Sequence, residues 1–123
     1  MKKILAQNSF LQFINKDMGE QPNLDYIDKL AAGDEAIRKR LISVLKQEFP
    51  IEVAIYREQI LNSIYLQAAE SVHKIRHKIG LLGLENSYFS SKIYEQNLRN
   101  NVLQNQINFE NTINKIEFFL KNI

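Results

Sequence analysis

The stretch IYLQAAESVHKIRHKIGLLG at residues 64–83 decides the fold of this 123-residue chain. Its apolar side chains recur at spacings of four, four, three, four and three: Ile64, Ala68, Val72, Ile75, Ile79 and Leu82. This spacing places them along one side of a helix, because an α-helix turns through about 100° per residue. The pattern therefore predicts an amphipathic helix with that side buried, beginning near Asn62 or Ser63 and ending near Gly83.

Three shorter helices are expected upstream. A helix over residues 24–31 stops at Gly33, and Asp34 caps the next one, which runs to about residue 48. A break is expected before Pro50, because proline suits the first turn of a new helix. The predicted buried sides carry Leu24, Ile27 and Ala31 in the first helix, Ile37, Leu41 and Leu45 in the second, and Phe49, Val53, Tyr56 and Ile60 in the third.

Helical spacing extends to both ends of the chain. A first helix over residues 3–16 makes residues 1–21 an N-terminal helical extension ahead of a domain over 22–123. Downstream, two further helices are expected. The segment from about 86 to 101 has the stripe Tyr88, Ser91, Glu95, Leu98 and Val102, and the terminal helix has the stripe Phe109, Ile113, Ile116, Leu120 and Ile123. With only four Gly and two Pro, the chain is predicted to be all-α, and short connections favour antiparallel neighbours in a bundle.

Composition narrows the possible functions. Because the chain has no cysteine, it has no disulfide, thiolate nucleophile or thiol-ligated zinc site, and we expect a cytoplasmic protein. Its apolar runs are far shorter than the roughly 20 residues that cross a bilayer, so no membrane span or signal peptide is expected. The net charge is only +2, which argues against nucleic acid as a partner. The RKR run at residues 38–40 is interpreted as a solvated helix face.

A second stripe on the helix over 64–83 carries reactive side chains. His73, Arg76, His77 and Gly80 stand at i, i+3, i+4 and i+7, so the imidazoles and the guanidinium should share a partly exposed face beside the buried side. A neutral imidazole is a competent nucleophile, and an adjacent cation can pair with phosphoryl oxygens. Spacing alone does not distinguish this interpretation from the alternative, a solvated helix face without function. Gly80 marks either a close approach by another backbone or the helix end.

The segment HKIRHKIGLLG at residues 73–83 resembles the signature of histidine-containing phosphotransfer domains. That signature is His, any residue, an aliphatic residue, Lys or Arg, and then Leu-Gly about ten residues on. These positions are filled by His73, Ile75, Arg76, Leu82 and Gly83. The preceding short helix ending at Gly-Asp is also similar to the family's opening. The resemblance implies an up-and-down four-helix bundle with an exposed reactive histidine, here with additional N-terminal and C-terminal helical segments.

In this family the histidine carries a phosphoryl group, so the resemblance implies a phosphorelay intermediate of two-component signalling. His73 would accept the group from a receiver-domain aspartyl phosphate or a hybrid histidine kinase and pass it to a response-regulator aspartate. Arg76 would pair with the phosphate. Such a domain is a carrier and not an enzyme, and it has no cofactor of its own because the partner receiver supplies magnesium. The alternative is a helical adaptor that binds a receiver or kinase without being phosphorylated.

His77 departs from the family pattern, which commonly has glycine after the Lys or Arg position. It is also the rival phosphorylation site, although the register of the Leu-Gly pair favours His73. The surface expected to dock the receiver comprises His77, Gly80, Lys74, Lys78, Ala69 and Glu70. Lys74 and Lys78 would steer the acidic receiver pocket electrostatically, with ordinary surface charges as the alternative.

Overall fold

The structure is a computed structural model that describes residues 19–123. Five helices and no strand lie within these residues, which confirms the predicted all-α class: α2 (Asp25–Ala31), α3 (Glu35–Leu61), α4 (Tyr65–Leu81), α5 (Glu85–Arg99) and α6 (Gln106–Lys121). The helix expected over residues 3–16 lies outside the described residues. No helix in this part of the chain combines the length and apolar character that crossing a membrane requires.

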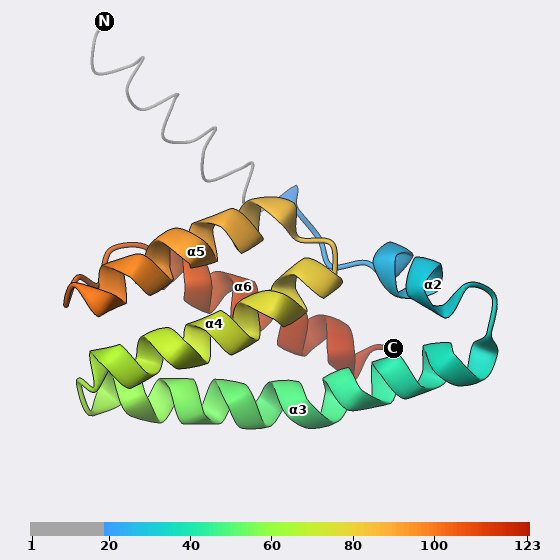
Figure 1. Cartoon of the computed structure of the whole chain (residues 1–123), viewed down its shortest axis with the longest axis horizontal. Coiled ribbons are helices and arrows are strands. Elements are labelled where there is room, and N and C mark those ends of the chain that lie inside the picture. Colours follow the sequence, from blue (N-terminus) through green and yellow to red (C-terminus); the bar gives the residue numbers. More distant parts are fainter. Residues whose placement is uncertain (1–18) are drawn as a thin grey trace, which may run out of the picture.

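Helices α3 to α6 run in alternating directions (Figure 1). Helix α4 packs between α3 and α5, α5 also contacts α6, and α6 returns to α3, so the four helices enclose a common core. The connections at residues 62–64 and 82–84 are short and favour antiparallel neighbours. Helix α2 packs on α3 at one end of the molecule.

Helix α4 forms where its apolar stripe predicts it. The fully buried residues of the stripe are Ala68, Val72, Ile75, Ile79 and Leu82. Ile64, predicted to share this side, is 42% exposed because it precedes the helix as its N-cap residue. The turn after α4 contains Gly83, whose φ of +78° is a conformation that glycine tolerates. The backbone N–H of Asn23 donates to the Leu82 carbonyl and ties the segment before α2 to this turn.

The helix break expected at Pro50 is wrong, because α3 runs on for 27 residues with Pro50 inside it. Proline removes a helical hydrogen bond and costs on the order of 3 kcal/mol in a helix interior. The Pro50 side chain is exposed. Four residues keep one unbroken line of buried side chains through this point: Leu45, Phe49, Val53 and Tyr56. Packing of this line against the core outweighs the local cost.

Three further apolar residues predicted to be buried are exposed: Ile37, Val102 and Ile123. Ile37 lies at the start of α3, which extends beyond the end of α4 in Figure 1. Val102 and Ile123 follow the last residues of α5 and α6, so helical spacing no longer fixes their direction. The stripe pattern therefore fails at helix ends, where the neighbouring helix or the helical repeat is missing.

Two tyrosine hydroxyl groups meet inside the core. Tyr56 of α3 and Tyr94 of α5 are fully buried, and their oxygens are 2.6 Å apart. Both rings also pack on Phe109 of α6, with ring centres 5.0 and 5.2 Å away. Because a buried hydroxyl needs a hydrogen-bond partner, this pair fixes the relative positions of α3 and α5.

Glu20 belongs to the predicted N-terminal extension, yet it packs against the helical domain. Its carboxylate accepts hydrogen bonds from the backbone N–H groups of Asn86 and Ser87 at 2.8 and 3.1 Å. These groups lie in the first turn of α5, where helical N–H groups lack partners within the helix. Glu20 therefore stabilises the start of α5.

Candidate functional site

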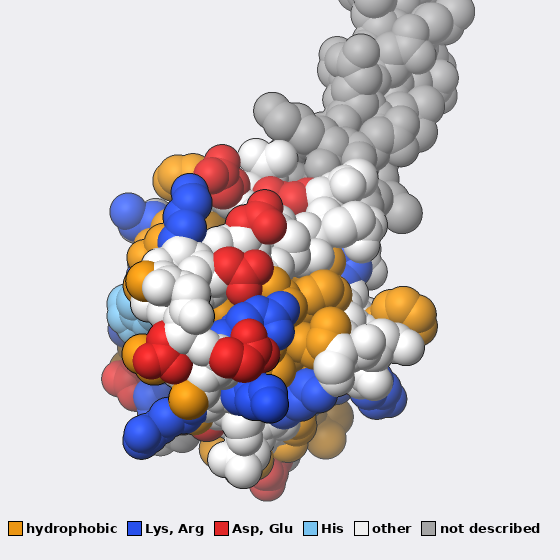
Figure 2. Space-filling model, turned by 90° about the vertical axis from the view of Figure 1, so that its right-hand side faces the viewer, with side chains coloured by type: hydrophobic (Ala, Val, Ile, Leu, Met, Phe, Trp, Pro, Cys, Tyr) orange, Lys and Arg blue, Asp and Glu red, His pale blue; other side chains and the backbone are white. Residues whose placement is uncertain are grey.

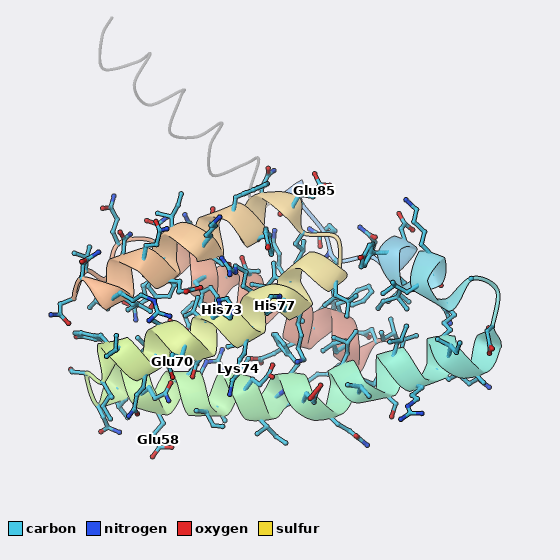
Figure 3. The ribbon with its side chains drawn as sticks, in the orientation of Figure 1. Glu58, Glu70, His73, Lys74, His77 and Glu85 are labelled. Carbon is cyan, nitrogen blue, oxygen red and sulfur yellow. The ribbon has the colours of Figure 1, made fainter. Side chains whose placement is uncertain are left out.

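His73 lies in the middle of α4, as the sequence predicts (Figure 3). The preceding residue, Val72, is fully buried in the core, whereas the His73 side chain is 48% exposed. The backbone of His73 is therefore fixed by a packed helix while its ring remains accessible. This combination suits a group that must be presented to a partner.

The residue that contacts His73 comes from the next helix. Glu95 of α5 places its Oε1 atom 3.1 Å from His73 Nδ1. The Glu95 side chain is only 12% exposed, and Arg99 Nη2 lies 3.2 Å from its other oxygen. Arg76 Nη2 lies 3.6 Å from Oε1. One carboxylate thus connects the imidazole with two guanidinium groups across the contact between α4 and α5.

Arg76 is buried, which contradicts the expectation of a partly exposed guanidinium beside His73. It is 8% exposed, and its Cζ lies 5.4 Å from the centre of the Tyr88 ring. The reason is that α5 packs closely along α4 and covers this side chain with a cation–π contact. Among the described residues Arg76 Nε has no hydrogen-bond partner. The guanidinium therefore faces α5 and not a free surface.

The Nδ1 atom of His73 lies near a donor and an acceptor at once. Arg76 Nη2 is 2.9 Å away and can only donate, whereas the Glu95 carboxylate can only accept. A proton on Nδ1 makes a hydrogen bond to Glu95, lets Arg76 pair with the same carboxylate, and leaves the lone pair on Nε2. A proton on Nε2 would instead bring the Nδ1 lone pair against a carboxylate oxygen 3.1 Å away. The Glu95 contact therefore favours the tautomer with a nucleophilic Nε2 atom, whereas the Arg76 contact favours the opposite tautomer, with the lone pair on Nδ1 and the proton on Nε2.

His77 lies one turn further along α4, next to His73 (Figure 3). The two rings meet edge to face with their centres 4.8 Å apart, and both are exposed. Their Nε2 atoms are 3.3 Å apart. The site therefore presents two imidazole nitrogens side by side at the surface.

The three residues closest in sequence to His73 on the expected docking surface, apart from those from His77 onward, differ in exposure. Glu70 and Lys74 are exposed on α4 beside His73 (Figure 3). Ala69 is fully buried, so its expected place on this surface is wrong. The buried side of α4 is wider than the single line of residues that the spacing identifies, and Ala69 lies within it. Only two of these three residues can meet a partner.

The residues after His77 are engaged within the chain. Lys78 is 14% exposed, and its Nζ lies 2.9 Å from Glu52 of α3. It is therefore paired, contrary to the expectation of a free steering charge. Gly80 faces Tyr88 of α5, because a β-carbon on Gly80 would lie 3.1 Å from a carbon of that ring. The close approach expected at Gly80 is thus made by an aromatic side chain and not by a backbone.

Sequence reasoning missed the contribution of α5. Glu95 and Tyr88 stood on the predicted stripe of residues 86–101, but nothing in the sequence linked them to α4. Glu95 contacts His73, and Tyr88 contacts Gly80. These two contacts are seven residues apart on each helix, as expected for antiparallel neighbours in register. The sequence did offer one signal for Glu95. The predicted stripe places its carboxylate on the inward side of a helix, where a charged group needs a partner.

Within residues 19–123 no group of three or more His, Asp or Glu side chains is arranged to hold a metal ion. At the end of the molecule that carries α2, acidic and basic side chains are interspersed around apolar ones, and this face has no continuous basic surface (Figure 2). Comparisons of the chain with models of protein families, with curated proteins and with solved structures found no match.

Proposed function

We propose that this chain is a phosphorelay intermediate of the histidine-containing phosphotransfer type. His73 accepts a phosphoryl group from a receiver-domain aspartyl phosphate and passes it to another receiver aspartate. One observation carries the proposal: an exposed imidazole in the middle of a packed helix, with its Nδ1 3.1 Å from the Glu95 carboxylate. In the proposed reactive state, Nδ1–H donates to Glu95 and Nε2 is the nucleophile. The motif at residues 73–83 supports the same role.

In the transfer step, the lone pair of His73 Nε2 attacks the phosphorus of the aspartyl phosphate. A P–N bond forms, the P–O bond to the aspartate breaks, and the carboxylate of the partner leaves with the bonding electrons. Because Nδ1 keeps its proton, the phosphorylated ring is positively charged. Glu95 stabilises this charge, since a fixed carboxylate next to the developing cation lowers the barrier. Transfer to the next receiver reverses these steps.

The neighbouring side chains take distinct roles in this proposal. Arg76 is directed at Glu95 and His73 Nδ1, so it positions the carboxylate and is not the cation that meets the phosphate from the solvent side. His77 Nε2 lies 3.3 Å from His73 Nε2. From there, His77 donates a hydrogen bond to an oxygen of the incoming phosphoryl group. This assignment explains why a histidine is useful where the family commonly has glycine.

The proposed partners are the receiver domain of a response regulator and a histidine kinase or hybrid kinase in the cytoplasm. The receiver supplies the magnesium ion and the acidic pocket, while this chain supplies a positioned nucleophile. We propose that α3 to α6 form the up-and-down four-helix bundle of this family, with α2 covering one end. Glu70 and Lys74 flank His73 on the surface that meets the receiver.

The proposal is tested by phosphoryl uptake from a panel of receiver domains loaded with acetyl phosphate. The parent protein should gain acid-labile, base-stable phosphate, and ³¹P NMR should assign it to the Nε2 atom. His73→Gln should gain none, whereas Glu58→Gln, at an exposed position of α3 (Figure 3), should match the parent. Uptake by His73→Gln equal to that of the parent would refute the assignment. Binding to a receiver without any uptake would favour the adaptor.

A further inference from the structure

The separation of the two histidine nitrogens matches a metal site. Zinc binds imidazole nitrogens at about 2.0–2.1 Å with tetrahedral geometry, so two ligand atoms on one zinc ion are about 3.3–3.4 Å apart. His73 Nε2 and His77 Nε2 are 3.3 Å apart. We propose that these two histidines bind a zinc ion at the surface of α4. A square-planar Cu²⁺ ion would require a separation of only about 2.8 Å.

The helix holds both ligands in place before the ion arrives. The two histidines are four residues apart on α4, a spacing that puts both rings on one helix face, as in helical zinc motifs. Both side chains are exposed, so an ion can reach them from solvent. Because the described residues contain no cluster of three or more potential ligands, water molecules complete the tetrahedron.

Glu95 supports the proposed site from behind. Its contact with His73 Nδ1 holds the ring and favours a lone pair on Nε2, which is the usual arrangement of a carboxylate behind a metal-bound histidine. His77 must carry its proton on Nδ1 to bind the ion. Zinc then replaces the contact between the two Nε2 atoms, and the helix need not change shape.

Zinc binding has a regulatory consequence that rests on the proposed function. The ion and the phosphoryl group require the same lone pair on His73 Nε2. A zinc-bound His73 cannot attack an aspartyl phosphate, and a phosphorylated His73 cannot bind zinc. The site would therefore make phosphoryl uptake sensitive to free zinc.

The binding step is tested without any phosphoryl chemistry. Calorimetric titration of the protein with Zn²⁺ should show one ion per chain, and Co²⁺ in its place should give the intense visible absorption of tetrahedral coordination. His73→Gln and His77→Gln should each lose this binding, Glu95→Gln should weaken it by about 10–100-fold, and Glu58→Gln should leave it unchanged. The site is refuted if the parent binds zinc no more tightly than the two histidine variants, or if Co²⁺ shows an octahedral spectrum.

A second measurement separates the site from its consequence. Saturating zinc should abolish phosphoryl uptake by the parent. His77→Gln should take up phosphate more slowly, because it lacks the proposed hydrogen bond from His77 to the phosphoryl group, and its uptake should respond little to zinc. Uptake by a zinc-saturated parent at its normal rate would refute the blockade. If no receiver phosphorylates the protein, the phosphorelay fails while the titration still decides the zinc site.

Discussion

Replacing Glu95 by Gln tests the central contact of the site. The substitution keeps the size and shape of the side chain and removes only its negative charge. In the parent, the carboxylate lies 3.1 Å from His73 Nδ1, and it is 12% exposed while the His73 side chain is 48% exposed, so solvent screens the contact in part. We expect slower phosphoryl uptake on His73 and a shift of the ring toward the tautomer with the proton on Nε2.

The expected magnitude follows from the change in hydrogen-bond type. A hydrogen bond to a charged group contributes about 1.5–3 kcal/mol, and a neutral one contributes about 0.5–1.5 kcal/mol. The charge of Glu95 therefore contributes roughly 1–1.5 kcal/mol to the state in which the ring becomes an imidazolium. Since about 1.4 kcal/mol corresponds to a factor of ten in rate, Glu95→Gln should accept phosphate about tenfold more slowly.

The assay is single-turnover uptake from one phosphorylated receiver, with ¹⁵N NMR of the imidazole rings as the readout of the tautomer. Glu58→Gln is the matched control, because it makes the same chemical change at an exposed position of α3. Thermal unfolding of each variant shows whether the fold is kept. Uptake by Glu95→Gln at the parent rate, with the proton still on His73 Nδ1, would refute the positioning role of Glu95.

Three further predictions concern the fold. Tyr56→Phe or Tyr94→Phe alone should lower the free energy of unfolding by about 1–3 kcal/mol, because the remaining hydroxyl is buried without its 2.6 Å partner. The double variant should lose less free energy of unfolding than the two single variants lose together. Additive losses in urea unfolding would contradict the pairing. Burial raises the pKa of Tyr94 to about 12 and also raises that of Tyr56. As the pH rises, the unfolded chain therefore loses these protons before the folded protein does. The contribution of the two tyrosines to the free energy of unfolding is fully present below about pH 10 and falls as the pH rises toward 12. Urea unfolding at several pH values measures this trend. Gly83→Ala should cost at least about 2 kcal/mol, because its φ is positive and the new β-carbon would lie 2.6 Å from Asn23. Gly33→Ala, with a φ of +85° and open space, should cost only the strain of about 1–2 kcal/mol, and equal losses in thermal unfolding would contradict a role for Asn23.

Local sequence was sufficient wherever a property depends on residues a few positions apart. The spacing of Val72, Ile75 and Ile79 predicts the buried side of α4, and His73 one step away is exposed as expected. Asp34 caps α3 through hydrogen bonds from two backbone N–H groups, as its position before the helix predicts. Helical geometry alone fixes these relations.

Only the tertiary structure decided which residues of neighbouring helices contact each other, and the site depends on these contacts. Pro50 continues α3 because Phe49 and Val53 pack on both sides of it along one core line. The His73 site is completed by Glu95, 22 residues away in sequence. Sequence spacing by itself determined that His73 stands at the surface of a helix. The register of α4 against α5, set by packing over their whole length, decided which carboxylate lies behind it.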